Sequence, residues 1–196
     1  MVNHTTRLGK QHILEIAEML FTENGYQSVS IRDIAQASGV TNAAIYYHFP
    51  SKEALFDEVV EKHAEKLADR MDKAREQATE TQDRIKAILG EYARQVFERR
   101  SPLFSLHRKP DKNHSEQVHK NHYRQIKRIL TPLENTLRIA FEQGELRQIP
   151  DDFSPAFLLL GLFHGMLQQR KYCTDKKINS RDIELVVDIF WHGIKQ

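Results

Sequence analysis

Apolar residues recur at spacings of three and four along most of the chain, and this periodicity predicts helices. Only 8 Gly and 6 Pro interrupt it over 196 residues. The first segment shows the pattern on one face, formed by Ile13, Ile16, Ala17, Leu20 and Phe21. No stretch alternates apolar and polar residues as a half-buried strand would. The sequence therefore predicts an all-α protein.

Helix ends are marked most clearly in the first fifty residues. Gly25 and Gly39 are expected to end helices, because glycine enters the left-handed conformation without a steric penalty. Ser30, Thr41 and Ser51 are expected to cap the following helices, and an acidic residue three positions after Ser30 completes a capping box. These signals predict three short helices and the start of a longer one.

Helices are also expected at about 83–100, 115–141 and 180–195, and one starts at Ser154-Pro155. Residues 102–114 contain a short helix at most, which makes about nine helices in all. Pro132 is expected to break or kink the helix in which it lies.

Composition excludes several classes of protein. A hydrophobic content of 40% is too high for a disordered chain. No run approaches the ~18 apolar residues of a membrane helix, and the N-terminus lacks the apolar core of a signal peptide. The single cysteine, Cys173, excludes an internal disulfide. We expect a cytoplasmic protein without a membrane partner.

Charge is distributed unevenly, although the formal net charge is only +2. Residues 1–66 hold 6 basic and 9 acidic side chains, whereas residues 99–128 hold 9 basic and 2 acidic ones. The basic stretch could attract an anionic effector or form a solvated loop. It also contains four histidines, His107, His114, His119 and His122. These histidines could bind zinc, but a structural site needs four ligands, and His122 lies on an apolar stripe where a core histidine is the alternative. We therefore predict no metal and no cofactor.

Residues 30–49 form a predicted helix-turn-helix. The second helix has small residues at its start and aromatic residues at its end, with Ile45 as its one fully apolar anchor. Most of this helix is therefore free to face outward. A helix of under two turns with small N-terminal residues can enter a major groove about 12 Å wide.

The same residues carry a resemblance to a known family. The segment 41–55 (TNAAIYYHFPSKEAL) is similar to the signature of the TetR family of bacterial transcriptional regulators. Residues 17–26 and 31–35 resemble the first two helices of that family, and the likeness extends over residues 7–66. Residues 144–147, followed by Asp151-Asp152, resemble the loop before its penultimate helix.

The resemblance implies DNA contacts at specific positions. Those expected to read bases are Ile31, Arg32, Thr41, Asn42, Ala43 and Ala44. Those expected to contact phosphates are Ser30, Tyr46, Tyr47, His48 and Lys52, while Thr6, Arg7 and Lys10 follow the adjacent groove or backbone. Asn42 could pair with adenine and Arg32 with guanine. Alternatively, Arg32 and Lys52 are solvated surface charges, His48 caps or packs, and the two tyrosines belong to the core.

The resemblance also implies two domains, a DNA-binding domain at 1–66 and an effector-binding and dimerisation domain at 67–196. A long helix links the helix-turn-helix head to a C-terminal bundle. Expected pocket residues are Phe97, Phe104, His107, His122, Tyr123, Ile126, Phe157, Leu160 and His164, with ordinary core packing as the alternative. Expected dimer contacts are Phe157, Gly161, Gly165, Ile183, Val187, Phe190 and Ile194.

The expected function is that of a homodimeric repressor, which a small-molecule effector releases from double-stranded operator DNA. Two alternatives belong to other classes. One is a helical enzyme or carrier that uses the histidine-rich stretch, although no nucleophile–base pair with suitable spacing supports catalysis. The other is a DNA-binding protein that responds to no ligand, such as an architectural factor.

Overall fold

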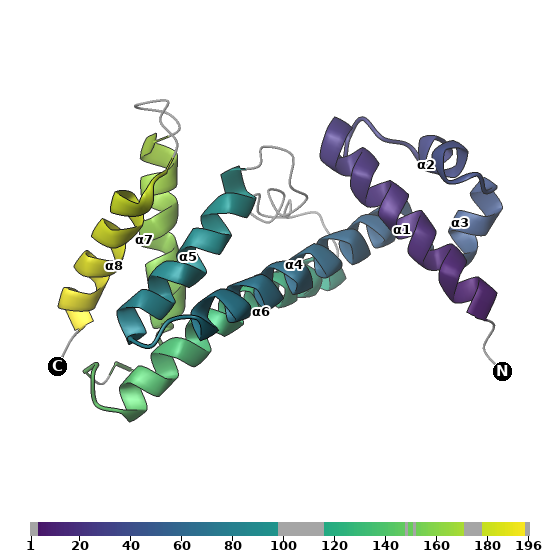
Figure 1. Cartoon of the computed structure of the whole chain (residues 1–196). Coiled ribbons are helices and arrows are strands. Elements are labelled where there is room, and N and C mark those ends of the chain that lie inside the picture. The colour runs from purple at the N-terminus through teal and green to yellow at the C-terminus, as the bar shows by residue number, and fades with distance from the viewer. Residues whose placement is uncertain (1–3, 98–115, 148, 151, 171–177, 195–196) are drawn as a thin grey trace. The chain divides into compact units, whose positions relative to one another are not determined.

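The computed structural model describes residues 4–97, 116–147, 149–150, 152–170 and 178–194, without the side chains of residues 4–8, 96–97, 116–119 and 122. Within these residues the chain forms eight helices and no strand (Figure 1). They are α1 (His4–Asn24), α2 (Ile31–Ser38), α3 (Asn42–His48), α4 (Lys52–Glu76), α5 (Thr81–Phe97), α6 (Glu116–Glu142), α7 (Pro155–Gln169) and α8 (Ser180–Ile194). The all-α prediction is confirmed. The short helix suggested within 102–114 lies outside the described residues.

The predicted helix ends of the N-terminal region are confirmed. Ser30, Thr41 and Ser51 each accept a hydrogen bond at the side-chain oxygen from the backbone N–H three residues on, at 3.2, 3.2 and 3.1 Å. Gly39 ends α2 with a φ of 67°, a conformation that a residue with a Cβ rarely adopts. Its N–H bonds back to carbonyls of the last turn of α2, so the turn between α2 and α3 is tightly closed.

Pro132 does not end the helix in which it lies, which excludes the break that was one of the two predicted outcomes. Helix α6 continues from Glu116 to Glu142 with this residue inside it. Pro132 and Leu133 are buried, and the hydroxyl of Thr136 donates to the Pro132 carbonyl at 2.8 Å. Burial of the apolar face therefore outweighs the backbone hydrogen bond that a proline removes.

The described chain divides into two compact units. The first comprises residues 4–64 and 116–125, and the second comprises residues 65–97 and 126–194. Helices α4 and α6 each begin in the first unit and end in the second.

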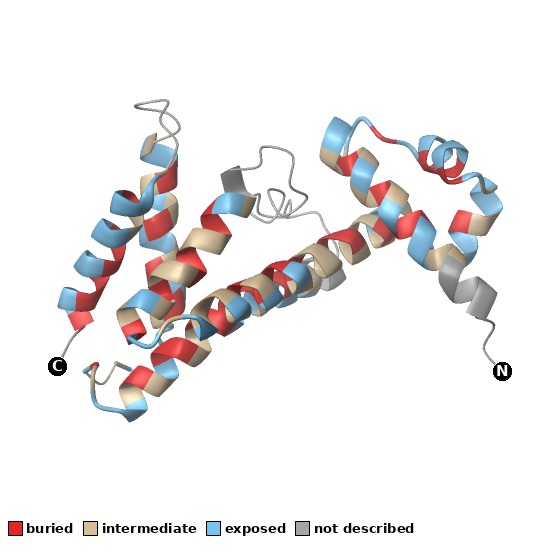
Figure 2. Cartoon of the chain, in the orientation of Figure 1, coloured by how far each residue is buried: buried red, intermediate tan, exposed pale blue. Residues whose placement is uncertain are grey.

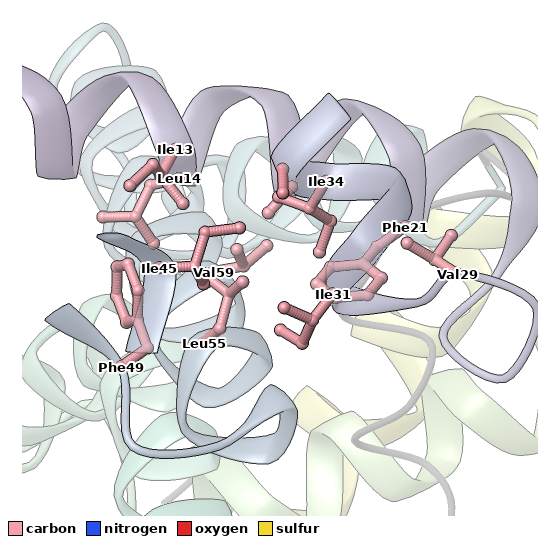
Figure 3. Packing of buried hydrophobic residues seen from close by; sticks show 12 residues of the cluster. Ile13, Leu14, Phe21, Val29, Ile31, Ile34, Ile45, Phe49, Leu55 and Val59 are labelled. Atoms are coloured by element: carbon pink, nitrogen blue, oxygen red, sulfur yellow. The ribbon is translucent and has the colours of Figure 1, made fainter. Parts of the chain in front are cut away.

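The core of the first unit lies between α1, α2, α3 and the start of α4 (Figure 3). Its buried side chains are Ile13, Leu14, Ala17, Phe21, Val29, Ile31, Ile34, Ala35, Ile45, Phe49, Leu55 and Val59. Phe21 and Phe56 pack edge to face, with ring centroids 5.2 Å apart. Helix α3 is thus held by a core to which it contributes one side chain, Ile45.

The second unit packs α8 against α5 and α7. Figure 2 shows α7 and α8 with buried residues on one face and exposed residues on the other. A polar pair lies within this core: the hydroxyl of buried Tyr92 is 2.5 Å from Nε2 of half-buried His164. Burial raises the pKa of the Tyr92 hydroxyl, which therefore stays protonated.

Candidate nucleic-acid interface

Helix α3 presents nearly its whole surface outward. Only Ile45 of its seven residues is buried, and Tyr47 has 78% of its surface exposed. Thr41, Asn42 and Ala43 at its start are also exposed. The small residues leave the backbone of the first turn open to a close approach. This arrangement suits the insertion of a helix into a groove.

The start of α2 is fixed by a reciprocal capping box. The backbone N–H and the hydroxyl of Ser30 donate to Oδ2 of Asp33 at 2.8 and 2.7 Å, while the Asp33 N–H donates to the Ser30 hydroxyl. These bonds, first the one from the hydroxyl, hold the pKa of Asp33 below its usual value. The cap fixes where α2 begins, and therefore where its exposed Arg32 lies.

Replacement of Ser30 by Ala is expected to lower the free energy of unfolding by about 1 kcal/mol, because an orphan N–H at the start of α2 loses its acceptor. Urea denaturation followed by circular dichroism measures this. Ser28→Ala, which changes an exposed serine two residues earlier, is the matched control. Equal urea midpoints for the two variants would contradict the structural role of the cap.

One predicted base-reading residue is placed elsewhere by the structure. Ile31 is only 9% exposed and belongs to the core of the first unit. It occupies the first helical position, and its side chain turns inward with Ile34 and Ala35. The expectation that Ile31 reads a base is therefore corrected. Arg32, the next residue, is exposed and remains a candidate.

The two lysines predicted to contact DNA have partners within the first unit. Lys52 Nζ donates to the Tyr26 carbonyl at 2.5 Å and lies 4.1 Å from the centre of the Tyr26 ring. Lys10 Nζ lies 2.8 Å from Oε2 of Glu58 and 5.2 Å from the centre of the Phe49 ring. These contacts tie α1 and the loop after it to the region of α4. A phosphate would compete with them for both cations.

Tyr26 extends this tie to the first turn of α4. Its hydroxyl donates to Oε1 of Glu53 at 2.9 Å. Burial and this bond raise the pKa of Tyr26, whereas the backbone N–H of Glu53 and the Tyr26 hydroxyl lower the pKa of Glu53. Sequence analysis did not identify this contact, because its partners are 27 residues apart.

The remaining predicted DNA contacts are distributed as follows. Ala44 and His48 are half-buried, and His48 packs against the ring of Tyr47 with centroids 5.0 Å apart. Tyr46 is exposed, so both tyrosines of α3 lie outside the core. The side chains of Thr6 and Arg7 lie outside those that the structure describes.

Not all the residues that were predicted to line the effector pocket are buried. Tyr123 is 67% exposed and Phe157 is 59% exposed, so neither lines a buried cavity in a single chain. Ile126 and Leu160 are half-buried, and His164 meets Tyr92 as described. The side chains of the others, Phe97, Phe104, His107 and His122, are not among those described. Of the described members, His164 lies beside the buried hydroxyl of Tyr92.

Three predicted dimer contacts prove to be core residues of the chain itself. Val187, Phe190 and Ile194 are buried in a single chain, and Ile183 is half-buried. In contrast, the predicted Phe157, Gly161 and Gly165 are exposed along one side of α7. Further exposed apolar residues were missed by the sequence analysis: Leu158 and Leu162 on α7, and Leu185 and Ile189 on α8. The Phe-Leu-Leu-Leu run at 157–160 was a signal, since one buried face needs only every third or fourth residue.

The charge asymmetry has a structural explanation in part. Arg124 Nε lies 3.7 Å from Oε2 of Glu61, and Arg128 donates to Oε1 of Glu65 at 2.7 Å. Basic residues of α6 thus meet acidic residues of α4. This pairing neutralises part of the positive charge of residues 99–128, the charge that was expected either to attract an anionic effector or to be solvated.

No group of three or more potential metal ligands occurs among the described residues, but the four histidines of the basic stretch lie outside the described side chains. A search of the same described part of the chain for helices with the length and apolar character of a membrane span returned none.

Comparison with known proteins agrees with this geometry. Residues 13–59 match the model of the family described as "Bacterial regulatory proteins, tetR family". The HTH-type transcriptional regulator AcrR of Shigella flexneri is 50% identical over 52 residues, which are 26% of this chain and 24% of that protein. The nucleoid occlusion factor SlmA of Yersinia pseudotuberculosis is 28% identical over 189 residues, which cover 91% of this chain and 93% of that protein.

The likeness in fold to solved structures covers much more of the chain than the N-terminal likeness in sequence to AcrR. The transcriptional regulator FadR of Bacillus subtilis, solved in complex with stearoyl-CoA, has a TM-score of 0.74 and 16% identity, covering 94% of this chain and 98% of that one. An N-terminal helix-turn-helix that matches the family model is thus followed by helices arranged as in a known regulator. The N-terminal segment of the chain is thus similar to that of the TetR family of bacterial regulatory proteins.

Proposed function

We propose that the chain binds a specific DNA operator as a homodimer and represses transcription until a small molecule releases it. The observation that supports this best is the outward face of α3, on which every residue but Ile45 is at least partly exposed. In this proposal α2, before the Gly39 turn, crosses the DNA backbone, and α3, after it, enters the major groove as the recognition helix. In this proposal residues 1–66 are the DNA-binding domain and residues 67–196 bind the effector and the second protomer.

Base reading and backbone contact are assigned to different residues of α3. Asn42→Ala is expected to remove about 1–3 kcal/mol of discrimination at one base pair of each half-site. Tyr47→Ala is expected to weaken binding to all sequences alike, because phosphate contacts position the protein without reading sequence. Selection of bound duplexes from random DNA, followed by titration of the selected site, measures both effects.

Gln143→Ala, in the exposed turn after α6, is the control for this experiment and should change neither property. Unchanged base preference in Asn42→Ala would refute the assignment of Asn42. Altered base preference in Tyr47→Ala would refute the division of roles.

The homodimer is proposed to form through the exposed apolar faces of α7 and α8. Phe157, Leu158, Leu162, Leu185 and Ile189 are exposed there in one chain. A second copy that covered them would remove this apolar area from water. Gly161 and Gly165 lie on the same side of α7, and no atom lies within 4 Å of a Cβ built on either glycine, so a partner helix could approach closely. Two recognition helices would then read two half-sites.

Release by an effector requires a molecule that binds one arrangement of the protein better than another. Tyr92 and His164 supply two polar groups, and the Tyr92 ring packs against that of Phe163, a combination that suits orientation of a small molecule. The Bacillus subtilis regulator that shares this fold was solved with stearoyl-CoA, which supports a ligand-binding role for such a helical domain.

A second candidate function is a DNA-binding factor that responds to no small molecule. The alignment with the Yersinia nucleoid occlusion factor, over 91% of this chain, favours it. A screen of metabolites for release of the selected operator distinguishes the two. Release by at least one metabolite supports the repressor, whereas many genomic sites and no releasing metabolite support the second function. A catalytic role receives no support from these relatives, since all three are named as regulators or as a nucleoid factor.

A further inference from the structure

Two amide side chains of α6 meet at one residue of α4. Asn121 Nδ2 donates to the carboxylate of Asp57 at 2.7 Å, and Gln125 Nε2 donates to the backbone carbonyl of Asp57 at 3.2 Å. Asn121 and Gln125 are one helical turn apart, so both reach the same turn of α4. All three residues belong to the first compact unit, together with the helix-turn-helix.

These contacts fix a register in a way that apolar packing does not. Gln125 is only 3% exposed, and its donor is directed at a carbonyl within a helix. Hydrogen bonds weaken steeply with distance and angle, whereas apolar side chains tolerate small shifts. A displacement of α6 along α4 by one residue, 1.5 Å in an ideal helix, would break both bonds.

Asp57 lies on the part of α4 that packs in the core of the helix-turn-helix. Its neighbours Leu55 and Val59 on α4 belong to the same core as Ile45, the anchor of α3. One turn earlier, Glu53 holds Tyr26. A change in the position of this turn of α4 therefore reaches the recognition helix through close-packed side chains.

We propose that Asn121 and Gln125 are positioning residues for DNA binding: they hold α4 at Asp57, and through it the recognition helix, in the arrangement that fits the operator. The proposal rests on the proposed DNA-binding function. It also gives the N-terminal turns of α6 a role that the sequence analysis did not assign to the basic stretch.

The test exchanges the two partners of the shorter bond. Asn121→Asp sets two carboxylates against each other, and Asp57→Asn combined with Asn121→Asp restores an amide–carboxylate pair in the opposite sense. We expect the single variant to lose operator affinity by about tenfold, the effect of losing one hydrogen bond to a charged group. The double variant should return to within about twofold of the wild type. Affinity is measured at a temperature at which circular dichroism shows every variant folded.

Hydrogen exchange gives a second measurement that needs no DNA. The amides of residues 53–58 should exchange faster in Asn121→Asp and recover protection in the double variant. Gln125→Met, which keeps the volume and removes the donor, should also lower affinity. Arg128→Met is the matched control, because it breaks a half-buried pair with Glu65 one turn further along α6 and should leave affinity unchanged.

Each outcome has a defined meaning. Wild-type affinity in Asn121→Asp, or a loss that the double variant does not restore, overturns the positioning role while the proposed function stands. Equal losses in Arg128→Met and Gln125→Met overturn it as well. Failure of the wild-type protein to select any DNA sequence would instead refute the proposed function, and the inference with it.

Discussion

Leu162→Glu is expected to convert the proposed dimer into a monomer and to abolish tight operator binding. Leu162 is exposed on α7 beside Phe157 and Leu158, and the proposed partner would bury it. An unpaired carboxylate in that setting costs several kcal/mol, which corresponds to a dissociation constant raised more than about 100-fold. A monomer presents a single recognition helix and so loses the second half-site.

Sedimentation equilibrium measures the dimer constant, and fluorescence anisotropy with the selected operator measures DNA binding. Ile189→Glu, on α8, is expected to act in the same way. Gln143→Glu adds the same charge in the exposed turn after α6 and should leave a dimer. If both interface variants remain dimeric with full affinity, the protomers associate through another surface.

Phe49→Ala is expected to lower the free energy of unfolding by about 3–5 kcal/mol, the usual cost of removing a buried aromatic ring. Phe49 is 1% exposed, follows α3 directly and lies in the same core as Ile45 and Leu55 (Figure 3). Because a whole domain is commonly stable by only about 5–15 kcal/mol, this loss should leave the head partly unfolded and DNA binding weak.

Tyr47→Ala provides the contrast, since this ring lies two residues away and is largely exposed. Its urea midpoint should match that of the wild type, although its affinity for DNA falls. Urea denaturation followed by far-ultraviolet circular dichroism measures both variants. A Phe49→Ala midpoint equal to that of Tyr47→Ala would show that the core does not depend on Phe49.

The local features of the head were predictable because each depends on residues close in sequence. The capping box of Ser30, the cap at Thr41 and the turn at Gly39 depend on partners within five residues. The single buried residue of α3 was also predictable, because Ile45 is the one branched aliphatic side chain in this helix. These features indicated the helix-turn-helix, and the resemblance of residues 41–55 indicated its family.

Features that depend on distant partners were not predictable. From the sequence, Lys52 was expected to contact a phosphate or to be a solvated surface charge. Its actual partner, Tyr26, lies 26 positions earlier in the chain, and no local pattern indicates that contact. Ile31 was expected to read a base only because of the family resemblance, whereas the spacing of Ile31, Ile34 and Ala35 already indicated that it lies on the inward face of its helix. On α8, periodicity identified an apolar face and could not distinguish the chain's own core from a surface for a second protomer. At Pro132 the local rule predicted a break or a kink, and the helix continues without a break because its apolar face is buried.

The internal ties of Lys10 and Lys52 have a consequence for how binding responds to ions. A protein releases condensed counterions from DNA in proportion to the phosphates that its cations neutralise, and this number sets how steeply affinity falls with salt. Lys10 already pairs with the Glu58 carboxylate, and Lys52 already contacts the carbonyl and ring of Tyr26, all within the first unit. Under the proposed function, each protomer would therefore neutralise few phosphates, and its affinity for the operator should fall only modestly as the ionic strength rises.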